Sequence, residues 1–236
     1  MPLQQIANTD IQTGIITGDR IASNTITGTS FQTNSVESYL NTQGTNLGMR
    51  NRIINGAMVI DQRNAGASVS TSSGSSIYTV DRWIAQWSVA SKFTIQQNAG
   101  SVTPPAGFTN YLGITSSSAY SIGSSDYFMV YQAIEGLNCA DLAWGTSSSK
   151  SVTLSFWVYS SLTGTFGGAI NNSALNRSYP FQYTISSANT WTQISITIPG
   201  DTTGTWETTT NRGIGVWFGL GAGSSTSGSA GSWSSS

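Results

Sequence analysis

The chain has 236 residues and a formal net charge of −1 at pH 7, and only 8% of its residues are charged, against about 25% in an average globular chain. The polar surface must therefore come from Ser, Thr, Asn, Gln and Gly, and the absence of a basic run excludes the electrostatic attraction that nucleic-acid binding needs. No stretch of about 18 apolar residues predicts a membrane-spanning helix, so we expect no membrane insertion.

Seven apolar residues near the N-terminus follow one another at intervals of five. Because a helix turns about 100° per residue, five-residue steps would scatter them over all its faces, and in a strand an odd step alternates between the two faces. Three chains wound together would bury one apolar ring per step. We therefore expect residues 1–36 to form an intertwined homotrimeric β stem, rather than a fragment of a single-chain solenoid or a disordered leader. The predicted axis residues are Ile6, Ile11, Ile16, Ile21, Ile26, Phe31 and Val36.

Within this region, the stretch IQTGIITGDRIASNTITGTSF (11–31) resembles the stems of phage tail fibres. The resemblance implies a virion protein, a homotrimer whose N-terminus contacts other phage virion proteins. The start MPLQQIANTD lacks the basic and apolar segments of a signal peptide, and Cys139 is the only cysteine, so no internal disulfide is expected. We therefore expect the chain to be made in the reducing host cytoplasm, with Cys139 as a small buried residue.

Residues 37–48 are mostly polar and predict a connector, and residues 49–236 predict a single all-β domain. Short runs rich in Val, Ile, Thr and aromatic residues alternate there with Ser/Gly/Asn clusters, a pattern typical of a β-sandwich or barrel. Roughly 190 residues suffice for one core without disulfides. The predicted strands are 52–62, 78–89, 92–97, 126–135, 151–160, 179–186, 190–199 and 213–221.

Alternation along three of these strands predicts which side chains face the core. The opposite parity leaves Trp157 and Tyr159 on the outer face of 151–160, and Trp217 on the outer face of 213–221. The predicted core residues are Val152, Leu154, Phe156, Val158, Ile194, Ile196, Ile198, Ile214, Val216, Phe218 and Leu220.

Six motifs occur in series in this region, namely NRIINGAMVIDQRNAG (51–66), YTVDRW (78–83), QAIEG (132–136), VTLSFWV (152–158), NTWTQISITIPGD (189–201) and RGIGVWFGL (212–220). Together they resemble the jelly-roll domain of phage tail-fibre and tail-associated proteins, which is similar to carbohydrate-binding modules with a galactose-binding-like sandwich. The resemblance implies fold and setting more strongly than a ligand. Such domains close with a further strand, whereas this chain ends in GAGSSTSGSAGSWSSS. We expect a truncated C-terminus, or a last strand supplied by another chain.

The chain contains no His, which removes the commonest general base and the His-based zinc sites. A pair of carboxylates would still suffice for glycoside hydrolysis, so a glycan-degrading spike remains a distant alternative. Asp81 and Arg82 are expected to form a structural ion pair, while Glu135 ends a strand and Asp201 lies in a turn. No loop of the type that binds calcium is present. We predict no enzymatic activity, no catalytic residue, no cofactor and no metal.

Sugars stack their C–H faces on aromatic rings and bind polar side chains around a shallow site, and the chain has eight Trp and nine Tyr. If strands 151–160 and 213–221 share a sheet, Trp157, Tyr159, Tyr183 and Trp217 form a candidate glycan site, unless these rings pack under a loop or against a neighbouring subunit. We expect a trimeric tail fibre that attaches to a host-surface glycan through several weak sites. The alternative is an architectural virion component, such as a head fibre, collar or tail adaptor, without receptor binding.

Overall fold

The structure, a computed structural model, describes residues 51–235, which belong to one compact unit, Asn51–Ser236. These residues contain strands and short 3-10 turns but no α-helix, and every strand pair is antiparallel. The prediction of an all-β chain is thus confirmed for this unit. The connector at 37–48 and the predicted stem lie outside the described residues, as do its axis residues Ile6, Ile11, Ile16, Ile21, Ile26, Phe31 and Val36.

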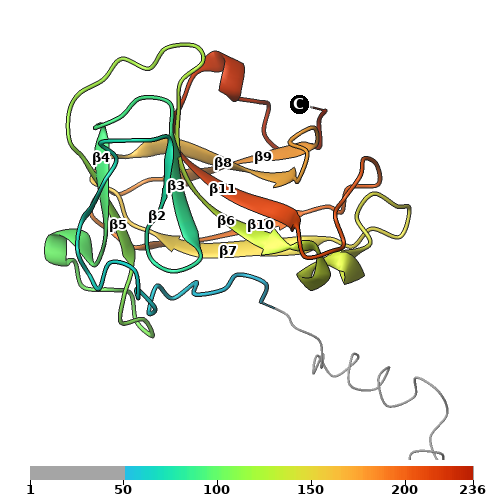
Figure 1. Cartoon of the computed structure of the whole chain (residues 1–236), viewed down its shortest axis with the longest axis horizontal. Helices are drawn as coiled ribbons and strands as arrows, with labels where there is room; N and C mark the ends of the chain where they lie inside the picture. The colour runs from blue at the N-terminus through green and yellow to red at the C-terminus, as the bar shows by residue number, and fades with distance from the viewer. Residues whose placement is uncertain (1–50, 236) are drawn as a thin grey trace, which may run out of the picture. The chain divides into compact units, whose positions relative to one another are not determined.

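The described residues form eleven strands in three antiparallel sheets (Figure 1). The six-stranded sheet has the order β2-β3-β6-β11-β8-β9, with β2 (Ser76–Tyr78), β3 (Trp83–Trp87), β6 (Tyr127–Glu135), β11 (Arg212–Ala222), β8 (Gly164–Asn172) and β9 (Ser178–Ile185). The three-stranded sheet has the order β1-β4-β5, with β1 (Val69–Ser70), β4 (Phe93–Gln97) and β5 (Leu112–Ser116). The two-stranded sheet pairs β10 (Thr192–Ile198) with β7 (Val152–Val158).

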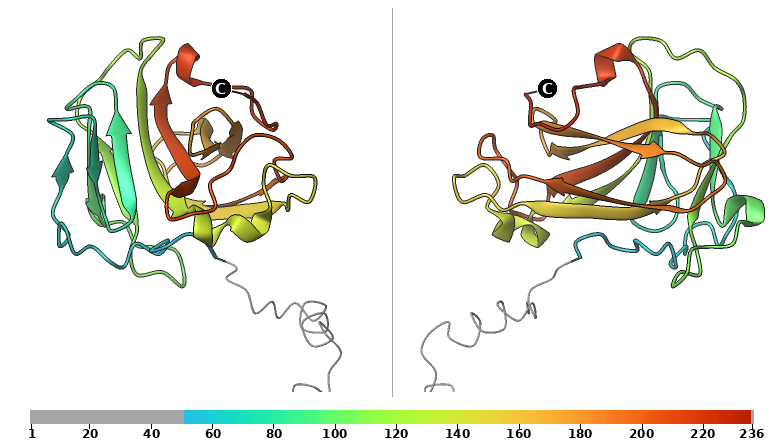
Figure 2. Two further views of the ribbon diagram at one scale, coloured as in Figure 1. Left: turned by 45° about the vertical axis from the view of Figure 1, so that its right-hand side comes forward. Right: turned by 180° about the vertical axis from the view of Figure 1, so that it is seen from behind.

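The six-stranded sheet packs one face against both smaller sheets, and Figure 2 shows this layering from two sides. Trp87 of β3 meets Phe93 of β4 edge-on, with ring centroids 6.1 Å apart, in a cluster that joins β3 and β6 to the three-stranded sheet. A second cluster joins β8, β9 and β11 to the two-stranded sheet through Leu154 and Ile198. Phe218 contacts both clusters, so the core is continuous under β11.

The predicted inner faces of β7 and β10 are confirmed. Leu154 and Ile198 are buried, and Phe156 and Ile196 pack against them. In β11 the prediction holds from Ile214 to Phe218 and is wrong for Leu220, which is 41% exposed. The pairing of β11 with β6 shifts between Gly219 and Gly221, and such a bulge reverses the parity of the residues beyond it.

The predicted strand at 52–62 is wrong, because this segment folds into turns. Asn55 and Met58 have φ values of 54° and 55°, a left-handed conformation that no strand contains. The side chain of Asn55 holds the turn: its Oδ1 accepts the N–H of Ile60 at 3.0 Å, and its Nδ2 donates to the carbonyl oxygens of Ile60 and Asp81. The segment is apolar in composition, yet side chains satisfy its backbone polar groups. Asn55 does so within the turn, and the buried Gln132 of β6 pairs with both the N–H and the carbonyl oxygen of Ile54.

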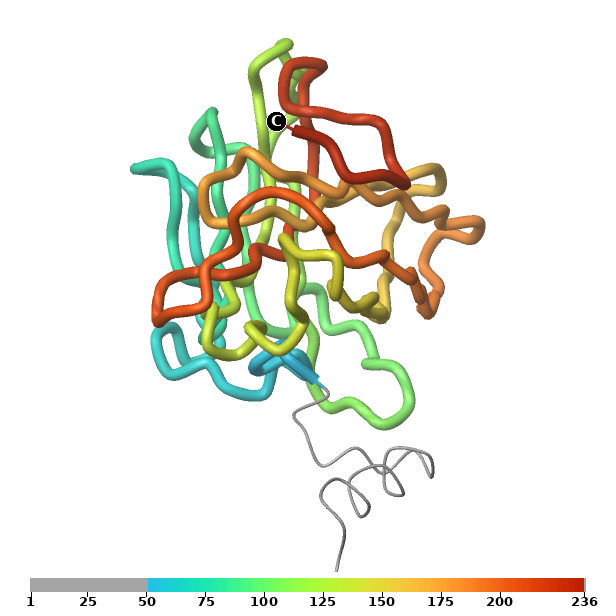
Figure 3. The backbone as a smooth tube through the Cα atoms, turned by 90° about the vertical axis from the view of Figure 1, so that its right-hand side faces the viewer, coloured from blue at the N-terminus to red at the C-terminus, as the bar shows by residue number. Residues whose placement is uncertain are grey.

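The Gly/Ser-rich C-terminal segment returns to the edge of β9, as Figure 3 shows in dark red. Ser178 and Ser234 exchange backbone hydrogen bonds of 3.0 and 2.9 Å, forming one antiparallel bridge. The ring of Trp233 packs 5.3 Å from those of Trp144 and Tyr179 and donates from Nε1 to the carbonyl oxygen of Pro199. The C-terminal segment thus adds a single bridge, anchored by one indole, to the edge of β9.

Cys139 is 7% exposed, and burial raises the pKa of its thiol to about 11. Since only the thiolate attacks disulfide reagents, we expect the folded protein to react with an aromatic disulfide about two orders of magnitude more slowly than free cysteine at mildly alkaline pH. One equivalent should react at the normal rate after unfolding in urea, as absorbance of the released thiolate would show. Rapid reaction of the folded chain would contradict the burial of this residue.

Candidate functional site

The four aromatic residues predicted to form one site are not brought together. The condition that strands 151–160 and 213–221 share a sheet is not met: β7 pairs with β10 in the two-stranded sheet, whereas β11 lies between β6 and β8. Because the two sheets pack with their inner faces together, Trp157 and Trp217 lie on opposite outer faces. Trp157 is 37% exposed there.

Tyr159 and Tyr183 pack against other rings of the domain. Tyr159 lies 5.4 Å from Trp191, whose Nε1 donates to the carbonyl oxygen of Thr103 at 2.8 Å. Tyr183 lies 5.1 Å from Phe156 in the interior, and burial raises the pKa of its hydroxyl to about 12. Trp217 is therefore the one predicted ring on the outer face of the six-stranded sheet.

Trp217 belongs to a row of side chains that crosses this outer face from strand to strand. The register pairs Tyr78 with Ile84, Ile84 with Tyr131, and Tyr131 with Trp217. The rings of Tyr131 and Trp217 stack with centroids 4.0 Å apart and planes inclined by 14°. We call these four residues, Tyr78, Ile84, Tyr131 and Trp217, the aromatic row.

Small residues beside Trp217 leave space for its ring on the outer face of β11. A Cβ atom on Gly215 would lie 2.4 Å from Nε1 of Trp217, so the indole lies flat over β11 only because this residue is glycine. Ala133 of β6 is paired with Gly215, and Gly219 continues the outer parity of β11 beyond Trp217. Tyr131 and Trp217 are accordingly only partly buried.

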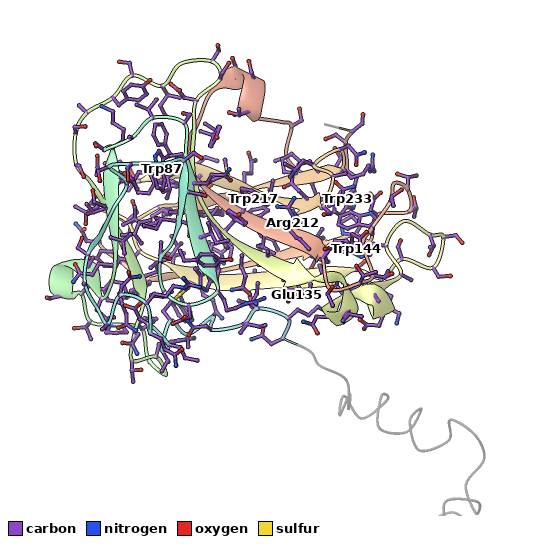
Figure 4. The ribbon with its side chains drawn as sticks, in the orientation of Figure 1. Trp87, Glu135, Trp144, Arg212, Trp217 and Trp233 are labelled. Carbon is purple, nitrogen blue, oxygen red and sulfur yellow. The ribbon has the colours of Figure 1, made fainter. Side chains whose placement is uncertain are left out.

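A cavity of about 150 Å³ opens beside the row, and two members of the row, Tyr78 and Ile84, line it. Figure 4 shows two of its polar members, Arg212 near Trp217 along β11 and Glu135 at the end of β6. Its lining residues are Tyr78, Arg82, Ile84, Ala133, Glu135, Thr210 and Arg212.

The carboxylate of Glu135 is held by Arg82 and not left free for catalysis. Nη2 of Arg82 lies 2.6 Å from Oε1 of Glu135, and Nδ2 of Asn138 donates to Oε2 at 3.3 Å. Burial raises the pKa of Glu135, but these hydrogen bonds and the charge of Arg82 outweigh that effect and lower it. Glu135 is thus ionised at neutral pH. Arg82 pairs with Glu135 and not with Asp81, whose Oδ2 accepts the N–H of Gln62.

Arg212 lies 5.8 Å from the centroid of the Trp217 ring. Its Nη2 donates to the carbonyl oxygen of Ser173 at 2.7 Å, and its Nε is buried without a partner in the described residues. Burial raises the pKa of Tyr131, and the nearby charge of Arg212 opposes this only in part. The hydroxyl of Tyr131 is therefore protonated at neutral pH and can donate a hydrogen bond.

Sequence analysis missed Tyr78, Tyr131, Arg82, Glu135 and Arg212 as members of one site. For Tyr131 a usable pattern existed, since Phe128, Val130 and Ile134 of β6 are buried and set Tyr131 on the outer parity.

The described residues contain no group of three acidic, Cys or His side chains able to hold a metal ion. None of their helices is long and apolar enough to cross a membrane.

Comparisons of the chain with protein-family models, with curated proteins and with solved structures find no match.

Proposed function

We propose that the protein is a structural protein of a bacteriophage virion, a trimeric tail fibre that attaches to a glycan on the host surface. In this proposal residues 1–36 form the stem and virion anchor, and the described unit is a β-sandwich of jelly-roll, galactose-binding-like type. The observation that carries the glycan attachment is the aromatic row, with a partly exposed pair of stacked rings and a polar cavity beside it. Sugars bind to such combinations of rings and polar groups.

The geometry supports the following mode of binding. One pyranose ring lies with its C–H face against the exposed side of the stacked pair formed by Tyr131 and Trp217. Its hydroxyl groups reach the cavity, where the side chains of Arg82, Glu135 and Thr210 offer donors and acceptors. Because the strands hold both rings in register before any ligand arrives, little conformational entropy is lost on binding.

Binding without turnover is the chemistry that this site favours. Hydrolysis of a glycoside needs two carboxyl groups, one of them protonated when it acts as the general acid. Glu135 is the one carboxylate among the residues that line the cavity, and its ion pair with Arg82 keeps it ionised. We therefore propose that the protein is not an enzyme and uses no cofactor.

A shallow site of this kind gives weak affinity, and trimerisation would compensate for it. Three copies on one fibre raise the effective concentration of each site at a repetitive polysaccharide, which can increase the overall affinity by two to four orders of magnitude. In this proposal the stem, by holding three copies together, increases the overall affinity for the polysaccharide.

The purified full-length protein should have three times the mass of the chain in light scattering, and should bind one or more members of a panel of bacterial surface polysaccharides without shortening them. A monomeric mass would contradict the trimeric stem. Shortened polysaccharide in gel filtration would identify an enzyme. Binding to none of the panel, combined with loss of the protein from particles when residues 1–36 are deleted, would favour the architectural alternative.

A further inference from the structure

We infer that the cavity beside the aromatic row, lined by Arg212, binds the carboxylate of an acidic sugar, so that the glycan recognised there contains uronic-acid units. This inference rests on the proposed glycan binding and specifies its ligand. The charge, the hydrogen-bond donors and the size of the cavity all favour such a group.

Arg212 supplies a positive charge that no carboxylate of the described residues neutralises. The ion pairs between residues 51 and 235 involve three other arginines. The guanidinium of Arg212 makes one hydrogen bond, from Nη2 to the carbonyl oxygen of Ser173, and its Nη1 makes none within this part of the chain. A guanidinium is planar and pairs with a carboxylate through two parallel hydrogen bonds. Arg212 therefore has both the charge and the donor capacity for an acidic ligand.

The one acidic side chain in the cavity does not cancel this preference. Both oxygens of Glu135 are already hydrogen-bonded, Oε1 to Arg82 and Oε2 to Asn138. Two arginines and one glutamate leave one positive charge among the lining residues. In a chain with only 8% charged residues, this concentration of charge beside stacked aromatic rings favours an anionic sugar over a neutral one.

The size of the cavity limits what enters it. At about 150 Å³ it is smaller than the pockets of roughly 300–1,000 Å³ that enclose whole small ligands. A carboxylate and the edge of its ring fit this space, while the rest of the sugar extends towards the stacked pair of Tyr131 and Trp217. The 5.8 Å between the Arg212 guanidinium and the Trp217 ring allows one sugar to contact both.

The test compares matched pairs of oligosaccharides in isothermal titration with the full-length protein. Each pair consists of a uronic-acid oligomer, built from galacturonate, glucuronate or mannuronate, and its carboxyl-reduced counterpart, which has the same stereochemistry without the charge. We expect at least one uronate to bind about tenfold or more tightly than its reduced form, with an affinity that falls as NaCl is raised. Equal or weaker affinity for the uronate in every pair would overturn the inference.

Arg212→Gln should remove the preference for the uronate and leave the affinity for the reduced oligomer within about twofold. Lys150→Gln, the same charge change at an exposed position outside the cavity, should leave both affinities unchanged.

If Arg212→Gln does not fold, the salt dependence of uronate binding to the wild-type protein decides whether the contact is ionic, because only a contact between charges weakens as salt is added. Neutral oligomers that bind as well as uronates, with Trp217 required for both, would overturn this inference and leave glycan binding standing. Binding of no oligomer and no polysaccharide would overturn both.

Discussion

Trp217→Ala is expected to weaken glycan binding by about 2 kcal/mol, roughly thirtyfold in Kd. The substitution removes half of the stacked pair with Tyr131 and with it the platform on which a sugar ring would lie. Folding should persist, because Trp217 is partly exposed and lies outside both core clusters. Binding is measured by titration with a polysaccharide that binds the wild-type protein, and folding by circular dichroism and thermal unfolding.

Trp157→Ala provides the matched control, since it also removes a partly exposed indole from an outer face of the domain. Trp157 lies on the other layer, away from Tyr131 and the cavity, so the affinity should stay within about twofold. Equal losses in both variants would show that binding does not depend on the aromatic row. A larger loss in Trp157→Ala would move the site to the β7 face.

Asp201→Ala is expected to lower the free energy of unfolding by about 3–5 kcal/mol, the usual cost of removing one partner from a buried ion pair. Asp201 is 1% exposed. Arg177 donates two hydrogen bonds to its carboxylate, from Nε to Oδ2 at 2.8 Å and from Nη2 to Oδ1 at 2.7 Å. The substitution would leave the guanidinium of Arg177 without its counter-ion in a mostly buried position. Urea unfolding followed by tryptophan fluorescence measures the loss.

The control for Asp201 is Asp141, whose partner Arg52 lies 2.7 Å away but whose own side chain is 61% exposed. Because solvent screens such a pair, Asp141→Ala should cost less than about 1 kcal/mol. Similar costs for the two variants would mean that burial does not strengthen the Arg177–Asp201 pair.

The buried carboxylate of Asp201 also makes the stability of the protein depend on pH. Burial raises the pKa of Asp201, but the hydrogen bonds from Arg177 and Thr203 and the charge of Arg177 outweigh burial and lower it. A pKa lower in the folded than in the unfolded chain gives a stabilisation that is fully present above the unfolded value, about 3.9, and is lost as the pH falls through the folded value. Asp201→Asn should therefore reduce the loss of stability below about pH 4 in urea titrations.

The sequence predicts the strands whose side chains alternate strongly, and it fails where backbone conformation decides. The parity of β7 and β10 follows from Leu154, Ile196 and Ile198, which match the buried positions. The segment 52–62 has a strand-like composition, but left-handed residues such as Asn55 turn it. Composition alone does not show that the side chain of Asn55 hydrogen-bonds to the backbone of its own turn.

Strand β8 was missed because its sequence, GTFGGAINN, contains three glycines, which weaken strand patterns. The structure explains one of them. A Cβ atom on Gly168 would lie 2.2 Å from the carbonyl oxygen of Trp217 and 2.4 Å from the ring of Phe181, so only glycine permits this close approach. Steric requirements set by distant strands are invisible in a local window of sequence.

The candidate site was predictable only in part, because its residues come from strands far apart in the chain. An outward Trp217 follows from the parity of Val216 and Phe218. That Tyr131 lies beside it depends on β6 pairing with β11, and alternation within each strand does not specify which strands are neighbours. The set of four rings depended on β7 lying beside β11, and the structure places these two strands in different sheets.

The aromatic row runs across four strands rather than along one. Neighbouring strands lie about 4.8 Å apart, so the row from Tyr78 to Trp217 spans about 14 Å at right angles to the strands. An extended polysaccharide on this row would contact β2, β3, β6 and β11 at once. Each of these strands would present one residue of the row to the polymer, so the spacing between strands, about 4.8 Å, would set the spacing of the contacts along it.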